Sequence, residues 1–176
     1  MHFRIFVTTI LYLDSAWPSD LYKICSNIYF LDSGCIRYFF YRNDIEYTHN
    51  VQMGPTAFGV TFGLTQKEVK SEVNIEALID THIYVLSQQD HQYLNKTYPS
   101  YKEIGDWSIE EVIKQRVEQG RKIASMSPEE RYLDFVDNNI ELIKILPQQI
   151  IASYLGIRPE SLSRIRKRIH SKNIKD

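Results

Sequence analysis

The stretch LPQQIIASYLGIRPESLSRIRKRI, residues 146–169, constrains the fold more than any other part of the chain. Apolar residues recur in it with a helical period, and Gly156 and Pro159 interrupt them. Two helices that cross at a steep angle need a small residue where their backbones approach, and Ala152 stands at that place. Gly156 can adopt the positive φ that ends a first helix, and Pro159 suits the first position of a second one. The spacing therefore predicts a helix-turn-helix that starts at Gln148.

The second of these helices carries polar side chains on the face that packing leaves outside. In a helical hairpin within a larger core, its cations would lack partners. In a DNA major groove, Arg can bond to guanine and Glu can accept from cytosine, while other cations and the helix N-terminus hold phosphates. This contrast favours DNA binding. The residues predicted to contact DNA are Gln148, Arg158, Glu160, Ser161, Ser163, Arg164, Lys167 and Arg168.

The distribution of charge supports the same interpretation. The 176 residues carry a formal net charge of −1, but residues 156–176 alone carry +5, which leaves −6 for the rest. A basic end on an acidic body indicates a polyanionic partner at that end.

The sequence changes its period near residue 98. Before it, short runs rich in Tyr, Phe, Val, Ile and Thr alternate with turn residues, which is typical of an antiparallel sandwich or roll. These expected strands cover residues 28–31, 35–42, 45–53, 72–79 and 82–87, with a buried strand near the N-terminus. Beyond it the pattern is helical, and Ser127 with Glu130 predicts a capping box. We expect an α+β chain with a β-roll at residues 1–97, a long helix at 98–125 and an all-helical domain at 126–176.

The long helix has an apolar stripe that allows two interpretations. The stripe could pack on its own roll, or two copies could pair as a coiled coil. One helix-turn-helix contacts only one half-site, whereas a dimer places two of them in successive major grooves. We therefore favour a homodimer. The predicted dimer interface comprises Ile109, Val112, Ile113, Arg116, Val117, Gly120 and Ile123.

Several other classes of protein are not favoured. Two cysteines, Cys25 and Cys35, are too few for a disulfide framework or a closed metal site, although one bridge stays open. The five histidines lack the spacing of a cupin metal site, and no nucleophile or phosphate-loop motif occurs, so we predict neither an enzyme, nor a metal, nor a cofactor. The apolar run at the N-terminus is short for a signal peptide, and none reaches bilayer length. We expect a cytoplasmic protein without membrane contact.

Two segments of the sequence resemble a known family. RYLDFVDNNIELIKILPQQIIASYLGIRPESLSRIRKRI resembles the C-terminal domain of Crp/Fnr-type transcription regulators of the short Bacteroidetes branch, and YFLDSGCIRYFFYRNDIEYT is similar to the hairpin of their cyclic-nucleotide-binding-like roll. The resemblance implies an antiparallel double-stranded β-roll sensor, a dimerisation helix, and a reader of pseudo-palindromic operators. Glu160 and Arg164 match the pair that reads bases in the family, and Lys167 matches a phosphate-binding Lys. Pro159 replaces a base-contacting Arg, so the half-site need not be that of the best-known members.

The resemblance implies less about the effector. Family members that bind cyclic AMP carry Gly-Glu and Arg-Ser/Thr, whereas this chain has Gly59 followed by Val60, and Lys70 followed by Ser71. Gly59, Lys70 and Ser71 are candidate ligand-binding residues, but cyclic AMP is doubtful without the carboxylate and the guanidinium. Double-stranded DNA is thus the expected partner, RNA polymerase a further candidate, and the effector open. The alternative is a ligand-binding or protein-interaction roll whose basic tail contacts polyanions without sequence preference.

Overall fold

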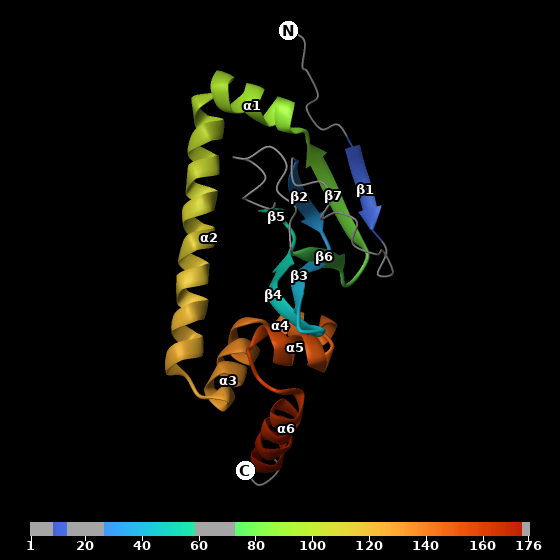
Figure 1. Cartoon of the computed structure of the whole chain (residues 1–176), viewed down its shortest axis with the longest axis vertical. Helices are drawn as coiled ribbons and strands as arrows, with labels where there is room; N and C mark the ends of the chain where they lie inside the picture. Colours follow the sequence, from blue (N-terminus) through green and yellow to red (C-terminus); the bar gives the residue numbers. More distant parts are fainter. Residues whose placement is uncertain (1–8, 14–26, 59–72, 174–176) are drawn as a thin grey trace.

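The computed structural model describes residues 9–13, 27–58 and 73–173, and within them the strands precede the helices, as expected from the sequence (Figure 1). The strands are β1 (Thr9–Leu13), β2 (Ile28–Ser33), β3 (Cys35–Arg42), β4 (Ile45–Met53), β5 (Thr56–Phe58), β6 (Asn74–Ala77) and β7 (Thr81–Leu86). The helices are α1 (Gln88–Thr97), α2 (Pro99–Ser125), α3 (Pro128–Asn138), α4 (Ile140–Ile145), α5 (Gln148–Tyr154) and α6 (Pro159–Asn173).

The strands form two antiparallel sheets that enclose one apolar core. One sheet has the order β1-β7-β2-β5 and the other the order β4-β3-β6. Because alternate residues of a strand point to the same face, each sheet supplies one row of core side chains. These are Tyr29, Leu31, Ile83 and Val85 from the first sheet, and Ile36, Tyr38, Ile75 and Ala77 from the second. The expectation of antiparallel sheets is thereby confirmed.

Two tight turns fix how the strands succeed one another. Asn43 and Asp44, between β3 and β4, both have positive φ, of 51° and 60°, as a two-residue type I′ hairpin requires. Gly34 joins β2 to β3 with φ of 104°, and a Cβ added there would meet the Thr81 hydroxyl oxygen at 2.3 Å. Only glycine fits at that position.

The long helix α2 follows a short polar helix, α1, and runs beside the sheets to α3 (Figure 1). Its bounds confirm the helix expected between residues 98 and 125. The predicted capping box is also confirmed, because Ser127 accepts from the backbone of Glu130 and the Glu130 carboxylate accepts from the backbone of Ser127. Across the described part of the chain, no helix combines the length and apolar character needed to span a membrane.

The outer face of the second sheet packs against the C-terminal helices. Cys35 and Val51 of this face share one apolar cluster with Phe135, Ile151 and Leu162. Burial raises the pKa of the free Cys35 thiol to about 11, so the group is an inert part of the core. The division into domains at residues 97 and 125 stays a prediction, since this cluster continues from the sheet into the helices.

Candidate nucleic-acid interface

The turn between α5 and α6 has the hydrogen bonds that stop a helix at a glycine. The backbone N–H of Gly156 donates to Ser153 O over 3.1 Å, and that of Ile157 donates to Ala152 O over 2.8 Å. This pair of bonds is a Schellman motif, which needs a left-handed residue at its centre. Gly156 has φ of 63°, so the positive φ expected from the sequence is confirmed.

A packed apolar layer holds α6 at a fixed angle to α5. Ala152 is fully buried, and Leu162 and Ile165 of α6 are buried in the same cluster as Ile151 and Leu155. The ring of Phe135 on α3 lies 5.7 Å from that of Tyr154 on α5 and supports the pair from behind. The small residue and the apolar positions of the predicted helix-turn-helix thus lie in the interior.

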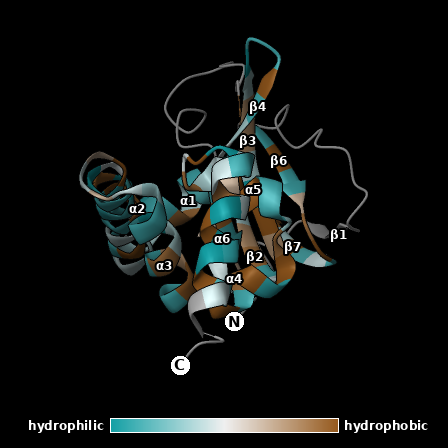
Figure 2. Cartoon of the chain, turned by 90° about the horizontal axis from the view of Figure 1, so that it is seen from below, coloured by the Kyte–Doolittle hydropathy of each residue, from teal (hydrophilic) through white to brown (hydrophobic). Residues whose placement is uncertain are grey.

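The opposite side of α6 carries its charged residues into solvent. Arg158, Glu160, Arg164 and Lys167 are exposed, and Ser161 and Ser163 are half-buried beside them. Among the residues that the structure describes, none forms an ion pair with Glu160, Arg164 or Lys167. In Figure 2, which views this end of the molecule from below, α6 lies foremost and is coloured largely hydrophilic.

Two of the predicted DNA contacts have a different setting. Arg168 forms an ion pair with Glu129 of α3, a residue 39 positions earlier, so a phosphate would compete with this carboxylate for the guanidinium. Gln148, at the start of α5, lies apart from the first turn of α6 but lines a groove of about 470 Å³ together with Ser163 and Lys167.

The same groove is lined by two residues that are not among the predicted DNA contacts. Arg166 and His170 of α6 line it beside Lys167. Both are exposed, and both follow Ser163 at the spacing of one face of a helix. That spacing was the available signal, because the predicted outer face comprised positions 160, 161, 163, 164, 167 and 168 and already included Ser163.

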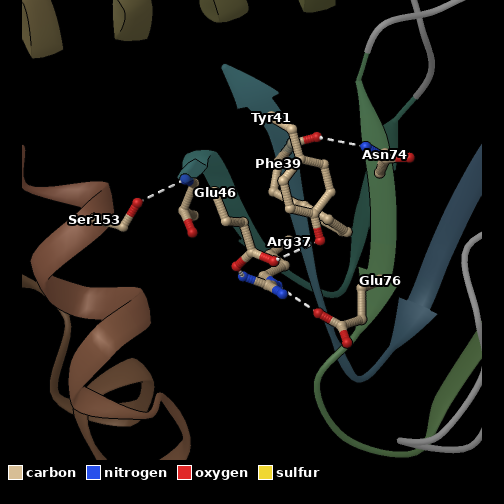
Figure 3. A network of polar contacts seen from close by, with 8 residues as sticks. Arg37, Phe39, Tyr41, Glu46, Asn74, Glu76 and Ser153 are labelled. Atoms are coloured by element: carbon tan, nitrogen blue, oxygen red, sulfur yellow. Dashed lines mark hydrogen bonds and ion pairs between the residues drawn. The ribbon is translucent and has the colours of Figure 1, made fainter. Parts of the chain in front are cut away.

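Hydrogen bonds tie α5 to the roll. The backbone N–H of Thr48 on β4 donates to the Ser153 hydroxyl over 2.8 Å (Figure 3). On the same sheet, the buried Arg37 of β3 donates to Glu46 on β4 over 2.5 Å and also to Glu76 on β6, which joins all three strands. The sheet that carries α5 is therefore cross-linked across its width by one guanidinium.

A second link connects the turn of the α5–α6 unit to the end of α2. The guanidinium of Arg131 on α3 donates to Met126 O over 2.7 Å and to Leu155 O over 2.9 Å, with longer bonds to Ile123 O and Gly156 O. These carbonyls lie at helix C-termini, where backbone acceptors otherwise lack partners. Arg131 thus couples the position of α6 to that of α2.

The predicted dimer stripe is exposed along α2. Ile113 and Val117 have exposed fractions of 57% and 58%, and Ile109, Val112 and Ile123 are exposed as well. A Cβ added to Gly120 would meet no atom within 4 Å. Ile104 and Trp107, nearer the start of α2, are also exposed, but the helical period of 3.6 residues places them on another side of the helix than this stripe.

Arg116 does not share the environment of that stripe. Its Nη1 donates to His49 O on β4 over 3.0 Å and to the Gln119 side chain over 3.2 Å. It therefore faces its own roll. The candidate ligand-binding residues Gly59, Lys70 and Ser71 lie outside the described residues, and no group of three or more possible metal ligands occurs within them.

Comparison with known proteins identifies the fold. No protein-family sequence model matches the chain, and no curated protein matches it in sequence. Among solved structures, the chain is similar to the c-di-GMP-responsive global regulator CLP from Xanthomonas campestris, with a TM-score of 0.71, 14% identity, and coverage of 94% of this chain and 87% of CLP. FixK2 from Bradyrhizobium japonicum gives a TM-score of 0.73 at 14% identity, with coverage of 94% and 86%.

A third solved structure bears directly on the resemblance stated above. A transcriptional regulator assigned to the Crp/Fnr family, from Eubacterium rectale, matches with a TM-score of 0.74 and 14% identity over 93% of this chain and 79% of that one. The chain therefore has a Crp/Fnr-like fold, with antiparallel sheets and a long helix, as the resemblance predicted.

Proposed function

We propose that the chain is a cytoplasmic, homodimeric, sequence-specific DNA-binding transcription regulator of the Crp/Fnr type, in which α5 and α6 form the helix-turn-helix reader. The observation that carries the proposal is the exposed face of α6, on which Glu160 and Arg164 project one turn apart above a packed apolar support. These side chains suit direct base readout, because Arg bonds bidentately to guanine and Glu accepts from cytosine. The likeness in fold to regulators supports the same function.

The surrounding residues suit contacts to phosphates. Arg158 lies just before Pro159 at the N-terminus of α6, and Lys167 lines the basic groove. Cations and helix N-termini that meet phosphates fix the position of a protein on a duplex without reading its sequence. We assign Arg158, Lys167 and, once released from Glu129, Arg168 to this role.

The dimer is part of the proposal, because a half-site alone gives little specificity. The exposed apolar face of α2 supplies a surface on which a second copy would pair. A two-fold axis along this face would present two α6 helices to one side of a pseudo-palindromic operator. The roll is assigned the sensing of an effector, and RNA polymerase is a further candidate partner.

Substitution of Arg164 and Lys167 separates specific reading from simple polyanion binding. Arg164→Ala is expected to lower the discrimination at one base pair of the half-site by about 1–3 kcal/mol, because it removes a base contact. Lys167→Ala is expected to weaken all duplexes alike and to reduce the slope of log affinity against log salt by about 1. Selection of sites from random duplex DNA, followed by titration of single-base variants, measures both.

If both substitutions lower the affinity for every duplex by the same factor, and the selection yields no two-fold motif, the tail binds polyanions without reading them. The alternative function, a ligand-binding or protein-interaction roll with a basic tail, would then stand.

A further inference from the structure

A cavity lies where the long helix, the second sheet and the reader helices meet. It has a volume of about 450 Å³ and is lined by residues of β4, α2, α3 and α5, among them Val51, Arg116, Phe135 and Tyr154. Cavities of a few hundred Å³ with apolar walls and a few polar groups are the usual form of small-molecule sites. This one lies outside the core that the two sheets enclose.

The charges in the cavity do not balance. Each acidic side chain that lines it has its own cation: Glu111 pairs with Lys114, Glu118 with Arg121, and Asp134 with Lys122. Arg131 is occupied by four backbone carbonyls. Arg116 is left with a carbonyl and an amide oxygen as acceptors, and no carboxylate among the described residues pairs with it. A half-buried guanidinium without a counter-charge is a site for an anion.

A second polar group in the cavity lacks a partner. The Tyr154 hydroxyl makes no hydrogen bond within the described part of the chain, although the side chain is half-buried and its ring packs on Phe135. Burial raises the pKa of Tyr154, so the hydroxyl stays protonated and can donate. The hydroxyl is thus free to donate from the wall of the cavity, which makes it a candidate contact to a ligand.

We propose that this cavity binds a small organic anion, whose carboxylate or phosphate group is held by Arg116 and Tyr154 and whose apolar body lies against Val51 and Phe135. The site joins α2 to α5, so an occupant would stabilise one arrangement of the reader relative to the long helix. The cavity would then be a second effector site, separate from any site inside the roll, an inference that rests on the proposed function. A ligand that binds one arrangement more tightly than the other would change the affinity for DNA. The change is limited by the ratio of the ligand's affinities for the two arrangements.

The binding test uses the full chain and no DNA, so that a failure of this site and a failure of DNA reading are distinguishable. Phenyl phosphate, benzoate and inorganic phosphate are titrated by calorimetry. We expect saturable binding of phenyl phosphate or benzoate, and the better of the two identifies the anionic group. Inorganic phosphate is expected to bind more weakly, because it leaves the apolar walls in contact with water.

Variants locate the binding. Arg116→Gln is expected to weaken the organic anion about tenfold or more, and Tyr154→Phe about fivefold, as expected for the loss of a charged and a neutral hydrogen bond. Lys102→Gln is the control, since Lys102 is an exposed cation of the same helix whose partner Asp106, like Lys102 itself, does not line the cavity, and it is expected to change nothing.

Circular dichroism verifies that each variant is folded. If Arg116→Gln does not fold, Tyr154→Phe still tests the site. The proposal is overturned if neither organic anion binds. It is equally overturned if the folded variants bind as tightly as the Lys102→Gln control, which would place the binding elsewhere.

Discussion

Val117→Asp is expected to separate the dimer into monomers. Val117 is 58% exposed on α2, between Ile113 and Gly120 on the apolar face that we assign to dimer contact. Burying a Val side chain contributes about 1.5–3 kcal/mol, and a two-fold interface counts every substitution twice. Loss of both contributions weakens the dimer by about three orders of magnitude in dissociation constant, and a carboxylate placed in an apolar seam weakens it further.

Sedimentation equilibrium over a range of concentrations measures this change. Gln115→Asp is the matched control, because Gln115 is an exposed residue of the same helix that borders the cavity rather than the apolar face. The control is expected to keep the dissociation constant of the unsubstituted chain. An unsubstituted chain that sediments as a monomer at every concentration would remove the dimer from the proposed function.

The dimer also determines how strongly the chain binds an operator. A single α6 contacts one half-site, whereas two copies about 34 Å apart contact successive major grooves. Once the first copy is bound, the second binds intramolecularly, which raises the overall affinity. Val117→Asp is therefore expected to abolish the preference for two-fold sites in the selection experiment. It should leave weak, salt-dependent binding to any duplex, since the exposed cations of α6 remain.

The features that the sequence predicted best are those set by neighbouring residues. The stop at Gly156, the proline at the start of α6 and the capping box of α3 each depend on a few consecutive residues, and all are present. The strands β3 and β4 have the predicted bounds, because the turn residues Asn43 and Asp44 fix where each one ends.

Elements without an apolar pattern were missed. The helix α1 buries none of its side chains, so its sequence, QQDHQYLNKT, lacks the apolar stripe by which α2 was predicted. It is stabilised at its start by Ser87, which accepts from the backbone of Asp90 over 3.1 Å. The strand β5, Thr56–Phe58, pairs with β2. Its three residues are too few for a period of two to be visible in the sequence.

Partners that are distant in the sequence could not be predicted at all. The helical period places Arg116 beside Ile113 and Val117, but its acceptor is the carbonyl of His49, 67 positions earlier. Arg168 likewise appears as a free cation in the sequence and is paired with Glu129 in the structure. The cavity beside α2 depends on four elements at once, and no single segment carries a signal for it.

Leu162→Ala is expected to destabilise the whole chain rather than α6 alone. Leu162 is 1% exposed and packs in the cluster that continues to Cys35 on β3 and Val51 on β4. Truncating a buried leucine lowers the free energy of unfolding by about 2–5 kcal/mol. The loss combines the apolar burial of the removed atoms with the cost of the cavity that they leave. Urea denaturation measures this loss, with Ile140→Ala as the control at an exposed position of α4, where a change within about 0.5 kcal/mol is expected.

Hydrogen exchange distinguishes a common core from separate ones. If the cluster acts as one cooperative unit, Leu162→Ala lowers the protection of amides in β3 and in α6 by the same free energy. Loss confined to α3–α6, with β3 unchanged, would instead mean that the reader unfolds independently of the roll. In the first case, the packing that sets the angle of α6 is the same packing that completes the outer face of the second sheet. A change in the sheet would then reach the DNA-reading helix through direct contact.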